Sequence, residues 1–154
     1  MDAFIEIYTD GAARGNPGPG GYGIVLKYKN FRKEISGGFN HTTNNRMELM
    51  AVIIGLESIT QKDLLVKIYS DSKYVIDSIN LKWVFRWQKN GFKNKANPDL
   101  WQRLLKCYNI KKHELIWVKG HADNIENNRC DELAVQISKK NNLPIDEGYV
   151  FLKV

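Results

Sequence analysis

Phe4-Ile5-Glu6-Ile7-Tyr8-Thr9-Asp10 is an apolar run, rich in β-branched and aromatic residues, that ends on a carboxylate. This composition predicts a buried strand over residues 3–9. The glycine- and proline-rich residues 10–21 then predict a loop. Residues 22–28 and 31–39 predict two further strands joined by a short turn. The first part of the chain should therefore form an antiparallel meander.

The rest of the chain alternates helical and strand patterns. In order, we expect a helix at 47–58 capped within 42–45, a strand at 64–69, helices at 71–79, 81–89 and 98–110, a strand at 114–118, and a last helix, capped by Asn127 or Asn128, to about residue 141. The order predicts an α/β protein: a five-stranded mixed sheet, with three antiparallel strands and then two parallel ones, flanked by helices. We expect a single domain over residues 1–154.

Four carboxylates occur where predicted segments end or begin. They are Asp10, Glu48, Asp71 and Asp131. Asp10 and Asp71 each follow a predicted strand directly, and parallel neighbouring strands would place both at one edge of the sheet. Hard oxygen ligands suit Mg²⁺, and two such ions can activate a water and stabilise a leaving oxygen. Each acid taken alone could equally be a helix cap or a turn former.

Composition narrows the class of protein. The chain has 154 residues, 43% of them hydrophobic, which is enough for a substantial core. It carries 23 basic and 17 acidic residues, a net charge of +6, which favours a polyanionic partner only moderately. The N-terminus has no basic leader, no apolar run reaches the roughly 18 residues of a membrane helix, and the two cysteines have no zinc-type spacing. We expect a cytoplasmic protein with no membrane contact.

Four ordered blocks of sequence resemble type 1 ribonuclease H. The first spans residues 10–23 and contains Gly-Asn-Pro-Gly-Pro-Gly-Gly-Tyr-Gly; the second is Thr-Thr-Asn-Asn-Arg-Met-Glu-Leu at 42–49; the third is Tyr-Ser-Asp-Ser-Lys-Tyr-Val at 69–75; the last is Trp-Val-Lys-Gly-His-Ala at 117–122 followed by Asn-Asn-Arg-Cys-Asp-Glu-Leu-Ala at 127–134. The resemblance covers nearly the whole chain, including a bacterial-type helical insert at 81–97.

The resemblance implies an endonuclease that hydrolyses the RNA strand of RNA–DNA hybrids and leaves 5′-phosphate and 3′-hydroxyl ends. Asp10, Glu48, Asp71 and Asp131 match the family's metal-binding carboxylates, which implies two Mg²⁺ ions with Mn²⁺ as a possible substitute. His121 matches a histidine of a flexible loop that assists proton transfer or product release. The resemblance also implies a hydrolase. Nothing in the sequence suggests an assembly larger than a monomer, so we expect a monomer.

The resemblance further implies how the hybrid is held. Asn16, Asn44, Asn45 and Lys73 fall at positions that contact RNA, although related proteins often carry glutamine at position 73. Thr43 and Asn97 match a DNA phosphate pocket. Residues 82–95 combine lysines with aromatics and match the basic protrusion that grips DNA; the contacts expected there are Trp83, Trp87, Lys89, Phe92 and Lys93. The loop after Gly91 is shorter than in the best-known bacterial members. Because most contacts would be to the backbone, cleavage should be nearly independent of sequence.

Two alternatives remain open at this point. The same sheet occurs in metal-dependent DNA nucleases and resolvases, and this analogy rests on fold alone. A non-catalytic hybrid-binding module would keep the basic face but lose a carboxylate, whereas all four are present in this chain. Cleavage of duplex DNA, or hybrid binding without cleavage, would distinguish these alternatives.

Overall fold

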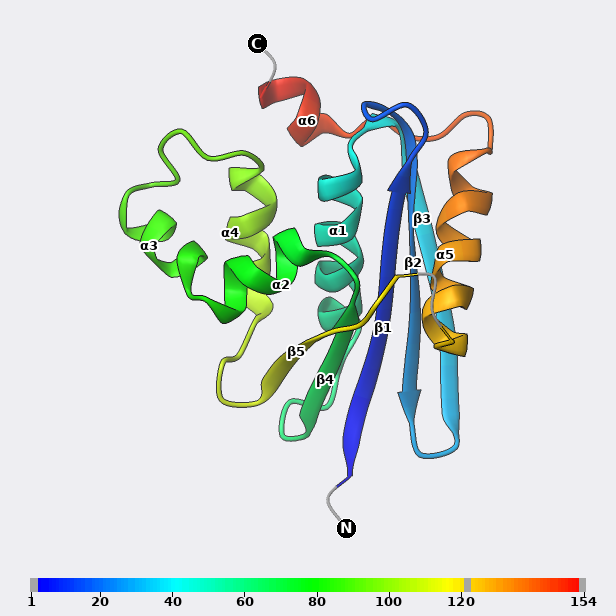
Figure 1. Ribbon diagram of the computed structural model, residues 1–154, viewed down its shortest axis with the longest axis vertical. Coiled ribbons are helices and arrows are strands. Elements are labelled where there is room, and N and C mark those ends of the chain that lie inside the picture. Colours follow the sequence, from blue (N-terminus) through cyan, green and yellow to red (C-terminus); the bar gives the residue numbers. More distant parts are fainter. Residues whose placement is uncertain (1–2, 121–122, 153–154) are drawn as a thin grey trace.

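The chain folds around one five-stranded sheet (Figure 1). The computed structural model describes residues 3–120 and 123–152. The strands are β1 (Phe4–Ala13), β2 (Gly18–Tyr28), β3 (Phe31–Thr42), β4 (Leu65–Ser70) and β5 (His113–Trp117), in the spatial order β3-β2-β1-β4-β5. The first three pair antiparallel, whereas β4 pairs parallel with both β1 and β5. The predicted mixed topology is confirmed.

Helices cover both faces of the sheet. They are α1 (Asn44–Glu57), α2 (Lys73–Asn80), α3 (Trp83–Lys89), α4 (Pro98–Cys107), α5 (Ile125–Ser138) and α6 (Glu147–Leu152). Helix α5 packs on β1, β2 and β3 on one face, and α1 packs on β1 and β2 on the other, with α4 behind it (Figure 1). Within the described part of the chain, none of these helices has the length and apolarity to cross a membrane.

The prediction of a long loop at residues 10–21 was wrong. β1 continues to Ala13 and β2 begins at Gly18, with Asp10 paired to Gly23 and Ala13 to Gly20. Only residues 14–17 connect the two strands. The glycines serve close packing here: a Cβ added at Gly23 would overlap the backbone oxygen of Cys130 in α5. A local rule that takes glycine for a loop signal cannot detect a helix that arrives from far along the sequence.

The other differences between prediction and structure concern where helices begin and end, and one helix that was not predicted. Helix α1 starts at Asn44, with Thr43 as its cap, and α4 stops at Cys107 rather than near residue 110. The cap of α5 is Asn124, whose side chain accepts from the Asn127 N–H at 3.0 Å, so Asn127 and Asn128 already lie inside the helix. Helix α6 was not predicted, because its short span gives no clear periodicity.

A buried ion-pair cluster ties the C-terminal segment to α1 and α4. Arg46 is 1% exposed, and its guanidinium lies 2.7 Å from Asp99 and 2.8 Å from Asp146. The Thr42 hydroxyl donates to Asp146 at 2.7 Å, and Asn97 accepts from Arg46 at 3.3 Å. Because Arg46 is paired with both Asp99 and Asp146, this cluster can hold the start of α1 against the rest of the fold.

Candidate active site

Three carboxylates from three elements converge at one edge of the sheet. Asp10 lies in β1, Asp71 follows β4, and Glu48 lies one turn into α1. One oxygen from each lies within 4.8 Å of the others. Since β1 and β4 are parallel neighbours in register, their carboxyl ends meet at this edge, as the sequence predicted.

A glycine lets α1 bring Glu48 this close. A Cβ added at Gly11 would lie 2.5 Å from the Glu48 backbone nitrogen, which is far inside contact distance. Only a residue without a side chain at position 11 permits this approach of α1 to β1. Gly11 therefore determines how close Glu48 comes to Asp10.

Asp131 joins the other three at the wall of a common cavity. This cavity of about 270 Å³ is lined by Asp10, Glu48, Asp71 and Asp131, together with Asn44 and Asn45. Asp131 reaches it from α5, on the opposite face of the sheet from α1. The structure thus gathers all four predicted carboxylates around one space, with Asp131 outside the tight group of three.

Burial and neighbouring acids make Asp10 and Glu48 costly to ionise. Desolvation raises the pKa of Asp10 to about 8, and the negative charges of Asp71 and Asp131 add to the effect. The pKa of Glu48 is raised well above its usual value by burial first, and then by Asp10 and Asp71. Such strongly shifted groups mark functional sites more often than structural ones.

These residues fit a divalent cation. Among the residues that the structure describes, Glu48 Oε1 is buried and has no hydrogen-bond partner, and two other carboxylates stand beside it. A bound cation would supply the missing partner and favour the charged forms of all three acids. The all-oxygen donor set suits Mg²⁺ or Mn²⁺ rather than zinc.

His121 lies outside the described residues. The chain just before it reaches the site, because Lys119 and Gly120 line a small cavity with Asp10, Asp71 and Asp131. A Cβ on Gly120 would lie 2.6 Å from an oxygen of Asp71. In the sequence, His121 therefore directly follows two residues that line the small cavity beside the carboxylates.

Two of the predicted RNA-contacting asparagines, Asn16 before β2 and Asn44 at the start of α1, are linked by hydrogen bonds. The Asn44 backbone N–H donates to Asn16 Oδ1 at 3.0 Å, and the Ala13 N–H donates to Asn44 Oδ1 at 2.5 Å. Thr43 caps α1 through its hydroxyl. The side chains of Asn16, Asn44 and Asn45 are exposed. Asn44 therefore stabilises the local backbone and also lines the carboxylate cavity.

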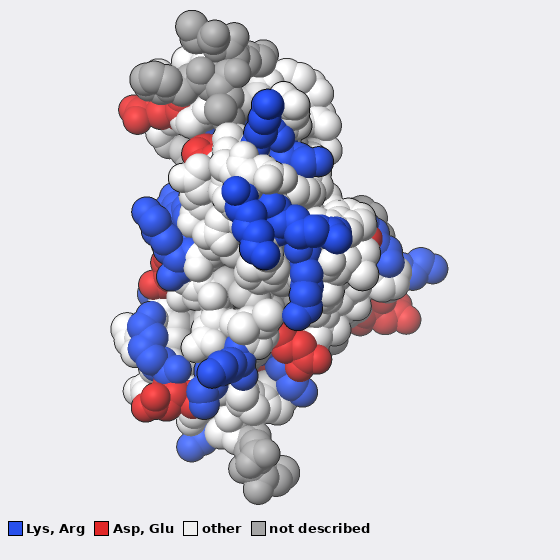
Figure 2. Space-filling model, turned by 90° about the vertical axis from the view of Figure 1, so that its left-hand side faces the viewer, with Lys and Arg blue, Asp and Glu red and all other residues white. Residues whose placement is uncertain are grey.

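The basic protrusion is formed by α3 and the turn that follows it. Figure 2 looks onto the side of the molecule where α3 lies in Figure 1, and lysine and arginine side chains gather across its middle. Lys89 and Lys93 are exposed, and Trp83 is 38% exposed. Trp87 is half-buried: its ring packs edge-on against Trp101, with the Lys95 ammonium 5.1 Å from its centre.

Two residues predicted to bind the hybrid are buried in this structure. Phe92 is 5% exposed and belongs to the hydrophobic core, so its burial does not fit the predicted substrate contact. Asn97 is 9% exposed, donates to the Tyr74 hydroxyl at 3.1 Å and accepts from Arg46. Phe92 has a positive φ in the turn after α3, and its ring packs in the core. No sequence pattern reveals this.

Asn127 and Asn128 were not among the predicted site residues, yet both line the small cavity beside Asp131. The Asn127 side chain donates to the backbone oxygen of Thr9 at 3.3 Å, just before Asp10. Asn127 precedes Asp131 by four residues, so the two share one face of α5. That spacing was the signal that could have identified Asn127.

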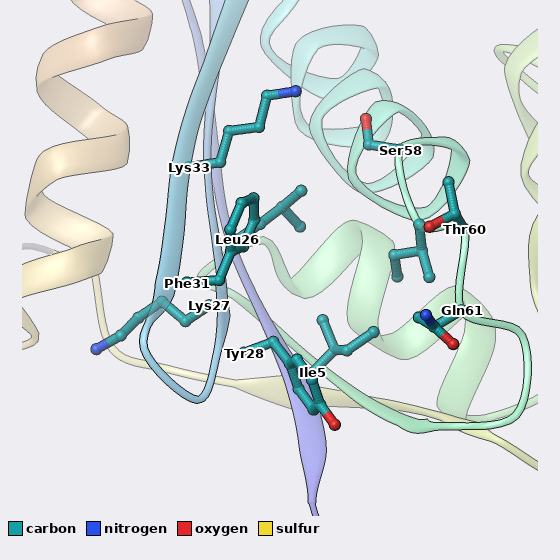
Figure 3. Close-up of a pocket in the computed structure, with 10 residues that line it drawn as sticks. Ile5, Leu26, Lys27, Tyr28, Phe31, Lys33, Ser58, Thr60 and Gln61 are labelled. Atoms are coloured by element: carbon teal, nitrogen blue, oxygen red, sulfur yellow. The ribbon is translucent and has the colours of Figure 1, made fainter.

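A largely apolar pocket lies away from the carboxylates. Figure 3 shows it between the β2–β3 hairpin and the segment that follows α1, with Ile5, Leu26 and Phe31 on one side and Ser58, Thr60 and Gln61 on the other. Ile5 precedes Asp10 by five residues, which is roughly 17 Å along a strand. No acidic residue lines this pocket among the described residues, so it has no part in the chemistry of the carboxylates.

Carboxylates gathered at the carboxyl edge of a mixed sheet, beside a basic surface, define a metal-dependent nucleic-acid hydrolase of the α/β class. A family model described as RNase H matches residues 2–139. The chain is 54% identical over 150 residues to "Ribonuclease H" of Rippkaea orientalis, covering 94% of this chain and 91% of that one. It is also 54% identical over 147 residues to "Ribonuclease H" of Desulforamulus reducens, covering 92% of each. The chain therefore belongs to the ribonuclease H family.

Solved structures agree with this assignment. LC9-RNase H1, described as a type 1 RNase H with the type 2 active-site motif, superposes with a TM-score of 0.77 at 30% identity, over 90% of this chain and 73% of that one. LC11-RNase H1, solved in complex with an RNA/DNA hybrid, gives a TM-score of 0.63 at 26% identity, over 94% of this chain and 99% of that one.

Proposed function

We propose that this chain is an endonuclease that hydrolyses the RNA strand of RNA–DNA hybrids, nearly independently of sequence, leaving 5′-phosphate and 3′-hydroxyl ends. The observation that carries the proposal is the shared cavity: four carboxylates and the amides of Asn44 and Asn45 line one space. The family membership and the hybrid-bound neighbour support the same substrate.

Asp10, Glu48, Asp71 and Asp131 would hold two Mg²⁺ ions, with Mn²⁺ as a substitute. When bound, the cations would supply an activated water and stabilise the leaving oxygen. A bound cation would favour the charged forms of Asp10 and Glu48, whose pKa values are raised by burial and by their acidic neighbours. His121 would assist proton transfer, such as delivery of a proton to the leaving 3′-oxygen, or product release.

Asn16, Asn44 and Asn45 would recognise the RNA strand. The side-chain oxygens of Asn16 and Asn44 already accept from backbone N–H groups. Their NH₂ groups are therefore the donors that remain to meet 2′-hydroxyl oxygens. Asn45 lines the carboxylate cavity and would contact the same strand near the scissile bond.

The basic protrusion would hold the DNA strand. Exposed Lys89 and Lys93 would pair with phosphates, and the exposed faces of Trp83 and Trp87 would pack on sugars or bases. Thr43 and Asn97 would contribute a phosphate contact, although Asn97 must exchange an internal hydrogen bond for it. We leave Phe92 out of this set because it is buried.

End-labelled RNA–DNA hybrid, duplex DNA and duplex RNA, each incubated with Mg²⁺ or EDTA, test the proposal. We expect cleavage of the RNA strand of the hybrid alone, only with the cation. Asp71→Asn should abolish it, whereas Asp63→Asn, which alters an exposed acid outside the cavity, should not. Cleavage of duplex DNA without hybrid cleavage would identify a DNA nuclease or resolvase, and hybrid binding without cleavage would identify a binding module.

We further propose that the protein acts as a monomer in the cytoplasm. Its two cysteines, Cys107 and Cys130, are both free thiols, which suits a reducing compartment. Sedimentation of the purified protein at several concentrations tests the oligomeric state.

A further inference from the structure

The C-terminal segment, residues 144–150, lies against the last residues of β3, which lead directly into α1. The Asn40 backbone N–H donates to the Pro144 oxygen at 2.9 Å, and the Thr42 hydroxyl donates to Asp146 at 2.7 Å. Figure 1 shows α6 beside the ends at which α1 and α4 begin. The segment therefore contacts the chain just before the first turn of α1.

One buried carboxylate holds this segment in place. Asp146 is 4% exposed and accepts from Arg46 through both of its oxygens, at 2.8 and 3.0 Å. Among the described side chains of residues 144–150, Asp146 alone is buried, whereas Ile145 and Val150 are 57% and 46% exposed. Docking of the segment therefore depends on an ion pair more than on apolar contact.

Arg46 connects the segment to residues expected at the hybrid. On its other side the guanidinium donates to Asp99 at 2.7 and 2.9 Å and to Asn97 at 3.3 Å, both at the start of α4. In the chain, Arg46 directly follows Asn44 and Asn45, which line the carboxylate cavity. One guanidinium therefore joins the C-terminal segment, the first turn of α1 and the start of α4.

The first turn of α1 depends on this ion pair more than Glu48 does. The first residues of a helix have no intrahelical partners for their N–H groups, so outside contacts fix their position. The two asparagines of this turn are exposed, and Arg46, 1% exposed, is the first buried residue of the helix. Glu48 stands between Met47 and Leu49, which are both 0% exposed in the core. Loss of the pair should therefore loosen the asparagines and leave Glu48 in place.

Stability alone does not account for a buried ion-pair cluster. Desolvation of the charges offsets much of their attraction, so such a cluster is often no more stabilising than packed apolar side chains. Apolar packing cannot reproduce its geometry, because an arginine fork meets a carboxylate through two hydrogen bonds in one orientation. The cluster of Arg46, Asp99 and Asp146 therefore fixes an orientation at the start of α1.

We propose that Asp146 is a positioning residue for the hybrid: through Arg46, the C-terminal segment orients the first turn of α1, and this sets substrate affinity rather than the chemical step. The proposal rests on the proposed function, because it takes the RNA strand of a hybrid as the ligand of that turn. It gives a part in substrate binding to a segment that does not line the carboxylate cavity.

The variants Asp146→Asn and Thr42→Val test this role, and the chain offers a matched control. Asp146→Asn keeps the size of the side chain and removes its charge, and Thr42→Val removes only the hydroxyl that donates to Asp146. Arg103 and Glu57 also join α4 to α1 through two hydrogen bonds, but at the far end of α1. Glu57→Gln therefore weakens a similar pair away from the cavity. Hybrid cleavage and, in EDTA, binding of fluorescent hybrid are measured for each variant.

For Asp146→Asn we expect KM and the dissociation constant of the hybrid to rise roughly tenfold, the equivalent of one or two neutral hydrogen bonds, with kcat unchanged. Thr42→Val should shift both constants in the same direction by less, and it provides the same test should Asp146→Asn fail to fold. Glu57→Gln should match the wild type. Urea unfolding of each variant sets a temperature at which all of them are folded.

Two further measurements distinguish positioning from a general loss of structure. The salt dependence of KM should stay as in the wild type, because asparagines are neutral and the cations expected at phosphates lie elsewhere. Lys73 is exposed at the first position of α2, and Lys89 and Lys93 lie in the basic protrusion. The affinity for Mg²⁺ alone, measured by calorimetry, should change far less in Asp146→Asn than the affinity for hybrid.

Three results would overturn the proposal. If Asp146→Asn keeps the wild-type KM and dissociation constant, the segment only stabilises the fold. If kcat and Mg²⁺ affinity fall as much as hybrid affinity, the whole of α1 is loosened and its first turn is not singled out. If Glu57→Gln raises KM equally, any contact between α1 and α4 has the same effect.

Binding of hybrid in EDTA separates this proposal from the proposed function. A wild type that binds hybrid but does not cut it with Mg²⁺ refutes the activity. The difference in dissociation constant between the wild type and Asp146→Asn still tests the role of the C-terminal segment in that case.

Discussion

The acidic cluster should make the metal-free protein less stable than its Asp10→Asn variant. In the folded, metal-free protein the pKa of Asp10 is raised to about 8 by desolvation and by Asp71 and Asp131. In the unfolded chain Asp10 has the ordinary pKa of an aspartate, 3.8. Between these two values the folded state binds the extra proton, so stability falls as pH rises from about 4 towards 8. The asparagine variant escapes this loss.

The size of the gain follows from the same two pKa values. A little over three pH units separate 3.8 from pH 7, and each unit corresponds to about 1.4 kcal/mol, which gives about 4 kcal/mol. Glu48 shares the repulsion with Asp10, so part of this free energy remains after the substitution. We therefore expect Asp10→Asn to gain about 2 to 4 kcal/mol at pH 7 and almost nothing at pH 4.

Urea unfolding in EDTA, followed by circular dichroism at pH 4, 5.5 and 7, measures this gain. The midpoint should rise for Asp10→Asn with an unchanged slope, and the rise should grow with pH. Asp63→Asn is the control, because Asp63 is exposed and should show no such trend. An equal gain at all pH values, or none at pH 7, would refute the electrostatic origin of the effect.

Three further predictions concern the fold and the basic surface. Gly23→Ala should destabilise the protein by about 1 to 3 kcal/mol, seen as a lower melting temperature, because the new Cβ overlaps the backbone of α5. Arg46→Met should cost about 3 to 5 kcal/mol in urea unfolding, because it leaves Asp146 buried without its cation, and Asp146→Asn in the same chain should recover part of that loss. Neutralising Lys89 and Lys93 to glutamine should raise KM for hybrid and flatten its dependence on salt; a fall in kcat alone would show that the protrusion does not bind substrate.

The sequence was sufficient for the sheet and for the carboxylates. The strand pattern predicted the mixed topology, and the acids that end or follow those strands do converge. Local patterns predict such features because strand direction alone places Asp10 and Asp71 at one edge. They could not predict contacts between distant segments, such as α5 on Gly23 or the C-terminal segment on Arg46.

Phe92 also shows that local sequence patterns do not predict packing between distant segments. Phe92 was predicted to contact the hybrid because it stands among lysines, yet its ring packs in the core with residues of α4. Trp83, in the same segment, is exposed as expected. Composition identified the basic surface, but only the packing of α3 against the core decides which ring faces outward.

The packing of α1 holds Glu48 beside Asp10 and Asp71 although the three carboxylates repel one another. Three acids within 4.8 Å repel one another, and a loosely attached helix would relieve the repulsion by moving away. Helix α1 cannot do so, because Met47 and Leu49, on either side of Glu48, are fully buried and Arg46 is held by Asp99 and Asp146. The packing free energy of α1 therefore maintains an arrangement that is unfavourable without cations. A bound cation would relieve the repulsion between the carboxylates, so a core substitution that loosens α1 should weaken cation affinity even though it touches no ligand.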